Sequence, residues 1–130
     1  MTRRHYRLTL DDALDAHDLA LQFGGGRPGE VNRGSIESAI GRPYSGYHRP
    51  IRRKAAALVE SMAGNHGFAD GNKRTTLILL GLLLGRSGYR LNASNHEVEE
   101  MILTVAKGEL NFDGIHDWLK ERVERKPPRR

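Results

Sequence analysis

The sequence predicts a single all-α domain, a bundle of about six helices around one central apolar helix. Apolar residues recur at helical spacing along most of the chain, and no stretch shows the sustained polar–apolar alternation of a half-buried strand. The most apolar run, residues 77–84, has the composition of a buried helix. A chain of 130 residues is long enough to bury such a core as one domain.

The first helix is expected to begin at Thr9, where Thr9 or Asp11 can cap it, and to end at the glycines of residues 24–26. Its recurring inward residues are Leu10, Ala13, Leu14, His17 and Leu21. Pro28 and Gly29 extend the break after the helix. The triple glycine is interpreted as a plain loop, because no strand precedes it and no Gly-Lys-Ser/Thr follows.

A short second helix is expected to be capped by Ser35 and to extend to about Ile40. The segment 41–50 contains two prolines and two glycines, so it cannot be helical throughout. A third helix is expected over residues 51–62. The residues that share its apolar face are Ile51, Ala55, Leu58, Val59 and Met62.

The central helix is expected over residues 73–86 and is stopped by Gly88. A fifth helix is expected to start at Ser94 or Asn95 and to end at Gly108. Its inward residues are Val98, Met101, Ile102 and Val105.

The last helix is expected to open at Asp113 or Gly114. Its inward residues are Ile115, Trp118, Leu119 and Val123. The helical pattern therefore defines one domain, residues 1–124. Residues 125–130 form a basic tail whose two prolines cannot continue a helix, and we expect this tail to be frayed.

Composition indicates the cellular compartment in which the protein is expected. The chain has no cysteine, which excludes disulfides and thiolate metal sites and favours a cytoplasmic setting. No secretory signal is expected, since the basic N-terminus leads into no apolar region. The run 77–84 is far shorter than the roughly 20 residues that span a bilayer, so no membrane association is expected.

The chain is basic, with 21 Lys and Arg against 16 Asp and Glu, a net charge of +5 and a pI near 9.9. Such a charge suits nucleic acid, an acidic protein partner, or a solvated surface. Aromatic residues are not regularly interleaved with the basic ones, so direct binding of nucleic acid is not expected.

The stretch from His66 to Arg74 combines the groups that chemistry on phosphates requires. A helix starting near Asn72 leaves its first backbone N–H groups unpaired, and Gly71 lets the backbone approach an anion closely. Lys73 and Arg74 add positive charge. The Asn72 side chain can donate to phosphate oxygens. These residues predict a phosphate-binding seat.

Three further residues of the stretch have separate expected roles. Asp70 is placed to hold Mg²⁺, a hard cation that shares phosphate oxygens. His66 has the near-neutral pKa of a general base for an attacking hydroxyl. Phe68 lies between them and is expected to point inward and to anchor the loop. The other histidines (His5, His17, His48, His96 and His116) lack such a context and are interpreted as structural or solvent-facing.

Each part of the stretch also has a simpler interpretation. A histidine at a helix end is often a cap or a core residue, and Asp70-Gly71 is a turn signal. Lys73 and Arg74 can be ordinary surface charge. His66 and Asp70 could be two metal ligands, although no third is evident nearby. The combination at one helix start distinguishes the phosphate-handling hypothesis from these.

The pattern His66-x-Phe68-x-Asp70-Gly71-Asn72-Lys73-Arg74 resembles the motif of the Fic/Doc family, in its Doc (death on curing) branch. The resemblance extends from residues 27–29 through the 35–42 helix and turn to about Val123. In the Fic branch the motif continues Gly-Arg-x-x-Arg, whereas Lys73 and Leu77 stand at the glycine and the second arginine, as in Doc-like proteins. Gly67 lies where Pro or Ile is common.

The resemblance implies transfer of the terminal phosphate of ATP, with Mg²⁺, to a protein hydroxyl. The implied target is a threonine of translation elongation factor Tu, so that translation and growth stop. His66 would be the general base, Asp70 the metal ligand, and residues 71–74 the phosphate clamp. A flap that holds the target polypeptide is implied near the active site, at Gly41, Arg42, Pro43, Tyr44, Ser45, Gly46 and Tyr47.

The resemblance also implies regulation by a second protein. The inhibitory Ser/Thr-x-x-x-Glu-Gly/Asn pattern of many Fic proteins does not occur in this sequence. A Phd-like antitoxin acting in trans is therefore expected, and an acidic, partly disordered segment would suit the basic surface. Two alternatives stay open: a Fic-type transferase of AMP or another nucleotidyl group, and a catalytically silent nucleotide-binding module.

Overall fold

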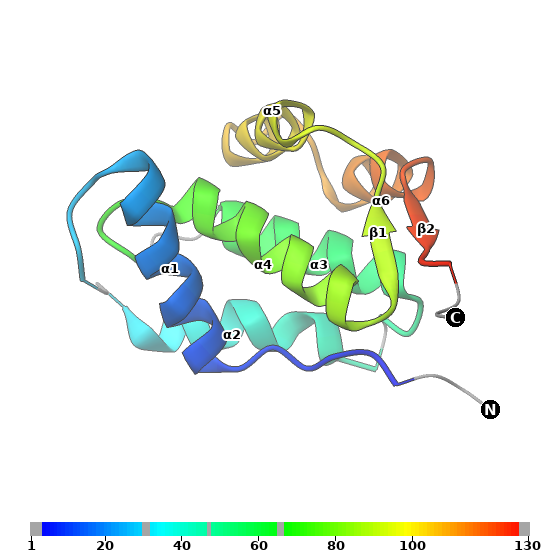
Figure 1. Ribbon diagram of the computed structural model, residues 1–130, viewed down its shortest axis with the longest axis horizontal. Helices are drawn as coiled ribbons and strands as arrows, with labels where there is room; N and C mark the ends of the chain where they lie inside the picture. The colour runs from blue at the N-terminus through cyan, green and yellow to red at the C-terminus, as the bar shows by residue number, and fades with distance from the viewer. Residues whose placement is uncertain (1–3, 30–31, 47, 65–66, 128–130) are drawn as a thin grey trace.

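A computed structural model describes residues 4–29, 32–46, 48–64 and 67–127 of the protein (Figure 1). Within these residues the chain forms six α-helices, one short 3₁₀ helix and two short strands. Their order is α1 (Leu10–Gly24), α2 (Arg33–Gly41), η1 (Arg42–Tyr44), α3 (Ile51–Ala63), α4 (Asn72–Arg86), β1 (Tyr89–Leu91), α5 (Asn95–Ala106), α6 (Phe112–Lys120) and β2 (Val123–Arg125). The predicted all-α bundle is confirmed. No helix of the described residues is long and apolar enough to cross a membrane.

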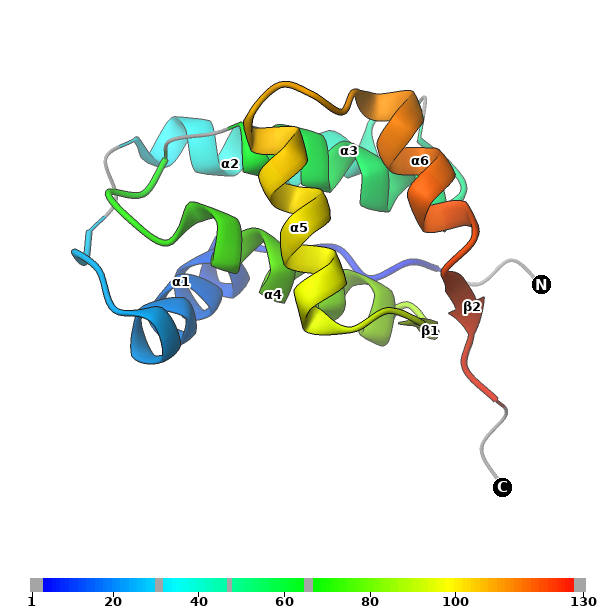
Figure 2. The same cartoon turned by 90° about the horizontal axis from the view of Figure 1, so that it is seen from above.

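The α4 helix is the centre of the bundle, as predicted. It packs between α1 and α3, and α5 crosses over it (Figures 1 and 2). Its buried residues are Thr75, Thr76, Leu79, Leu80, Leu83 and Leu84. Since α3 and α4 run in opposite directions, the connection between them lies at one end of the bundle, beside the loop that follows α1 (Figure 2).

Side-chain caps fix two helix starts where the sequence predicted them. The Thr9 hydroxyl accepts a hydrogen bond from the Asp12 N–H at the start of α1. The Ser94 hydroxyl does the same for Glu97 at the start of α5. In both helices the acidic residue also accepts from the backbone N–H of the capping residue, which completes a capping box.

Two other helices begin earlier than predicted. Asn32, not Ser35, caps α2, and its side-chain oxygen accepts from the Ser35 N–H at 3.0 Å. Asn111 caps α6 in the same way through the Gly114 N–H, so that helix opens before Asp113. The predictions at Ser35 and Asp113 were wrong because an asparagine three residues before the bonded N–H caps equally well.

The sequence did not predict the two strands. β1 and β2 pair antiparallel, with Tyr89 opposite Arg125 and Leu91 opposite Val123. Each strand has only three residues, too few for a recognisable polar–apolar alternation, so the sequence does not indicate them. Val123 is buried as expected, but in β2 and not in the last helix. The pairing continues into the predicted tail, where the Lys126 N–H donates to the Gly88 carbonyl at 3.0 Å.

Candidate functional site

The described part of the motif, residues 67–74, spans the α3–α4 connection and the first turn of α4. Gly71 precedes this helix with φ +82°, a backbone conformation that favours glycine, and it provides no side-chain cap. The first N–H groups of α4 are therefore left without a capping oxygen. His66, the predicted general base, lies outside the described residues, so its role stays a prediction.

Phe68 and Asn72 hold the connection in shape. The Phe68 side chain is 2% exposed, as an anchor of the loop must be. Its backbone N–H donates to Asn72 Oδ1 at 3.2 Å, and Asn72 Nδ2 donates to its carbonyl at 3.0 Å. Asn72 Oδ1 and one N–H of the Asn72 amide thus bond to the loop, while the second N–H of Nδ2 keeps the predicted donation to phosphate open.

Asp70 presents a charged carboxylate beside the start of α4. Its Oδ2 accepts from the Arg27 backbone N–H at 2.8 Å and lies 3.4 Å from Arg27 Nε. The backbone N–H and then the guanidinium of Arg27 hold the pKa of the Asp70 carboxyl below its usual value. The side chain is 45% exposed, so this ionised group remains accessible to a cation.

The loop that follows α1 lies directly against the motif. The Ala69 N–H donates to the Gly29 carbonyl and the Asn32 N–H to the Gly67 carbonyl, each at 3.1 Å. Gly26 has φ +116°, and a Cβ at this residue would lie 3.0 Å from Asp70 Cβ. The triple glycine, which the sequence indicated only as a loop, therefore allows this loop to approach Asp70 closely.

His17 also contacts the motif, a contact that the sequence did not indicate. It belongs to the apolar face of α1, as predicted, and is 4% exposed. Its Nε2 lies 2.7 Å from the Asp70 carbonyl oxygen. Its ring stacks on Phe68, with centroids 3.9 Å apart and planes 9° from parallel.

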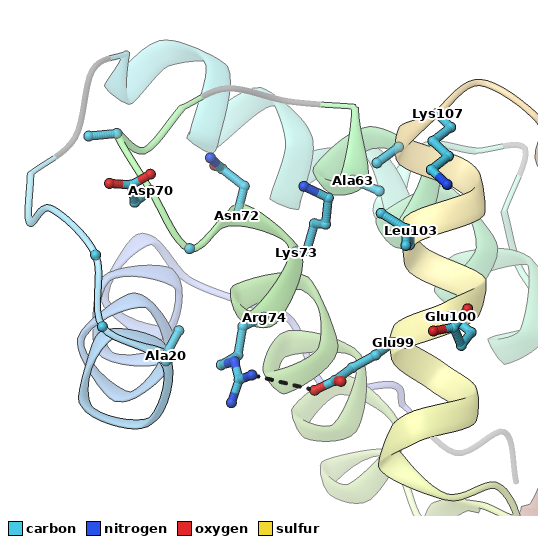
Figure 3. A pocket seen from close by; sticks show the side chains of 16 residues that line it. Ala20, Ala63, Asp70, Asn72, Lys73, Arg74, Glu99, Glu100, Leu103 and Lys107 are labelled. Carbon is cyan, nitrogen blue, oxygen red and sulfur yellow. Dashed lines mark ion pairs between the residues drawn. The ribbon is translucent and has the colours of Figure 1, made fainter.

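An open cleft of about 870 Å³ lies in front of the motif (Figure 3). One side is formed by the end of α1 and the glycine loop, and the other by α5. Its charged lining residues are Asp70, Lys73, Arg74, Glu99, Glu100 and Lys107. The volume is typical of a site for a small-molecule ligand. The sequence did not indicate Glu99 and Glu100 of α5 or Lys107 just after it, because they follow the motif by more than twenty residues.

Arg74 and Glu99 face each other across this cleft, with Arg74 Nη2 3.7 Å from Glu99 Oε1 (Figure 3). Both side chains are almost half exposed, at 42% and 46%, so the pair is weak. An anion in the cleft can therefore replace Glu99 as the partner of Arg74. Lys73 is exposed and lines the same cleft from the first turn of α4.

None of the described residues of the predicted flap, 41–46, is among those that line this cleft. From the end of α2 the chain packs along α3 through η1. Arg42 pairs with Glu60 at 2.9 Å, and Pro43 is buried. Glu60 belongs to the last turn of α3, the end of the helix that leads into the motif, and the role of the segment in target binding stays a prediction. Tyr47 lies outside the described residues.

A magnesium site at Asp70 is compatible with the geometry. The described residues contain no group of three or more His, Cys, Asp and Glu side chains that could hold a metal. Mg²⁺ does not need such a group, since it is commonly bound through one or two carboxylates together with waters and substrate phosphates. Asp70 is ionised, accessible, and next to the N–H groups where phosphates would bind.

Comparison with known proteins gives concordant matches. The model of the Fic/DOC family matches residues 7–84, which include α1, the motif and most of α4. The chain is 32% identical over 117 residues to a protein named Toxin Doc from Mycolicibacterium smegmatis, over 83% of this chain and 86% of the relative. It is 29% identical over 114 residues to Protein kinase doc from Escherichia phage P1, over 85% and 90%.

Proposed function

This chain belongs to the Fic/Doc family, and we propose that it is a Doc-like toxin kinase that transfers the terminal phosphate of ATP to a hydroxyl of a translation protein. The observation that carries the proposal is the uncapped N-terminus of α4, which opens with Lys73 and Arg74 into a cleft next to the ionised Asp70. The names of the relatives, a toxin and a protein kinase, support the same reaction class.

In this proposal each residue of the motif acts on a defined atom. The N–H groups that follow Gly71, with the cations of Lys73 and Arg74, bind and neutralise the phosphate oxygens. His66 takes the proton from the attacking hydroxyl as the new oxygen–phosphorus bond forms and ADP leaves. Asp70 would hold Mg²⁺, which neutralises charge that develops on the phosphates.

Leu77 favours phosphate transfer over the nucleotidyl alternative. In the Fic branch this position carries an arginine that positions the triphosphate, whereas Leu77 packs here against the apolar core. The side of α4 that would carry the second arginine is therefore used for packing. Transfer of AMP remains the second candidate function, and a catalytically silent nucleotide-binding module the third.

The proposed partners follow from the same reasoning. By family resemblance, the target is a threonine of elongation factor Tu, which would place the protein in the cytoplasm. A Phd-like antitoxin would restrain the enzyme in trans, and the net charge of +5 favours an acidic antitoxin segment.

Intact-mass measurement of elongation factor Tu, after incubation with this protein, ATP and Mg²⁺, tests the proposal. A gain of one phosphate, absent with His66→Ala, supports the kinase. A gain of one AMP would replace it with the nucleotidyl transferase. An unchanged mass, with nucleotide binding shown by calorimetry, would favour the silent module or another target. ATP labelled at the α or the γ phosphate identifies the group transferred to any protein of a cell extract.

A further inference from the structure

Among the residues that the structure describes, His17 is the only ionisable side chain that is buried, at 4% exposed. Burial of an imidazole without a partner is costly, so its bonding partners indicate what it does. Those partners are not on its own helix. They belong to the connection 67–71, more than fifty residues away in the sequence.

The ring contacts this connection at two points. Its Nε2 lies 2.7 Å from the Asp70 carbonyl oxygen, which can only accept, so Nε2 carries a proton and donates it. Its face stacks on the buried Phe68 ring at 3.9 Å. One side chain of α1 therefore holds both the backbone and the anchoring side chain of the loop.

The same segment of chain also holds the Asp70 carboxylate. Arg27, in the loop that leaves α1, donates its backbone N–H to Asp70 Oδ2 at 2.8 Å. His17 of α1 thus holds the backbone carbonyl of Asp70, and Arg27 of the loop after α1 holds its carboxylate. Together these contacts determine where the carboxylate lies relative to the first N–H groups of α4.

We propose that His17 is a positioning residue of the active site. Through its bond to the Asp70 carbonyl it fixes the position of the Asp70 carboxylate and of the phosphate-binding seat at residues 71–74. Its consequence for turnover rests on the proposed function, but its effect on the loop does not. A displacement of about 1 Å in a catalytic group costs up to roughly 100-fold in rate. Loss of the His17 donor can therefore slow the reaction although His17 does not contact the substrate.

Three variants separate positioning from general stability. His17→Phe keeps the stacked ring and loses the donor. His17→Gln keeps an N–H donor the same number of bonds from Cβ and loses the ring. Ile115→Val removes a methyl group from a fully buried residue of α6, outside the cleft, and serves as the control for lost stability.

Amide hydrogen exchange of the free protein is the first measurement. The Phe68 and Ala69 N–H groups report on the loop, because each has a defined acceptor in Asn72 or Gly29. The Asn92 N–H, bonded to the Arg122 carbonyl at 2.7 Å, is the remote reference. We expect His17→Phe to speed exchange at Phe68 and Ala69 about tenfold relative to Asn92, and His17→Gln to restore part of the protection.

Calorimetric binding of ADP with Mg²⁺ is the second measurement. We expect roughly tenfold weaker binding by His17→Phe, partial rescue by His17→Gln, and wild-type affinity for Ile115→Val. In a kinase assay the His17→Phe defect should lie more in kcat than in the KM for ATP.

Two results would overturn the inference: wild-type exchange and affinity in His17→Phe, or equal changes in Ile115→Val at the same loss of Tm. If the wild-type protein transfers no phosphate, the proposed kinase fails, whereas the exchange measurement still decides whether His17 holds the loop.

Discussion

At the N-terminal end of α4, the backbone N–H groups meet a glycine without a capping side chain and an open cleft. At its C-terminal end, the protein itself supplies donors to the carbonyl groups. The Ser87 N–H donates to the Leu83 and Leu84 carbonyls, and Lys126 Nζ to the Gly85 carbonyl at 2.9 Å. Every helix has unpaired groups at both ends, and in α4 the N-terminal groups are the ones that stay accessible from a cleft.

The two ends also differ in how the neighbouring chain is attached. The Tyr44 hydroxyl donates to the Tyr6 carbonyl and accepts from the Leu8 N–H, each at 2.7 Å, and the Tyr6 N–H donates to Ser87 Oγ. The last of these bonds attaches the N-terminal segment to Ser87, at the C-terminal end of α4. At the N-terminal end of α4, His17 and Arg27 instead bond to the motif, and glycines with positive φ shape the loops. The charged groups of this end stay exposed to the cleft.

The largest effect should come from His66→Ala at the motif end. Loss of the proposed general base should lower kcat by roughly 100- to 10,000-fold while the fold is retained. Single-turnover phosphorylation of the target, with circular dichroism as the control for folding, measures this. Turnover at the wild-type rate would contradict the assignment.

Asp70→Asn should weaken Mg²⁺ binding by more than about 100-fold, because the amide loses the negative charge that the cation needs. The pH dependence follows from the same group. The pKa of Asp70 is lowered, so its contribution to Mg²⁺ binding persists below the usual titration range of aspartate and is lost as the pH falls through that lowered value. Titration of Mn²⁺ by electron paramagnetic resonance checks both; equal affinity in the variant would exclude Asp70 as a ligand.

Gly71→Ala should destabilise the protein by about 1–2 kcal/mol, because residue 71 needs φ +82°. Gly81, within the helix that Gly71 precedes, is the matched control: it is exposed, and a Cβ there meets no atom within 4 Å. Gly81→Ala should therefore stabilise by about 0.5–1 kcal/mol. Urea denaturation measures the change in unfolding free energy of both variants. A change of the same sign in both would contradict the prediction.

Tyr44→Phe tests the opposite end. The variant leaves the Leu8 N–H and the Tyr6 carbonyl without the hydroxyl, which should cost about 1–2 kcal/mol of unfolding free energy. Because this contact is far from the cleft, kcat and the KM for ATP should not change. A fall in kcat without further unfolding would contradict this expectation and support the predicted role of the segment 41–47 in target binding.

The smallest effects concern one surface ion pair at each end. Glu99→Gln and Glu124→Gln each remove a partly exposed partner, of Arg74 and of Arg90, and should change stability by less than about 0.5 kcal/mol. Only Glu99→Gln should alter the salt dependence of nucleotide binding, since only Arg74 lines the cleft. Calorimetry at two salt concentrations measures it; equal responses of the two variants would show that Arg74 does not bind the phosphates.

Local signals were enough for most of the helices and insufficient for several of their ends. Thr9 and Ser94, each one of two residues proposed for its helix start, do form the caps, and the partners of a capping box lie within four positions of each other. The starts of α2 and α6 were missed because Asn32 and Asn111 compete with cap-forming residues a few positions later. The strands β1 and β2 depend on each other, about 30 residues apart, and neither has a pattern of its own.

The sequence by itself determined the helical bundle, its central apolar helix, and the motif that places this chain in its family, because periodicity and short motifs are properties of neighbouring residues. Only the tertiary structure decided that His17 and Arg27 hold Asp70, and that Glu99 of α5 and Lys107 after it line the cleft. It also decided that η1 packs against α3. Such contacts join residues from different helices, and packing of the whole core sets their geometry, so no local pattern contains them.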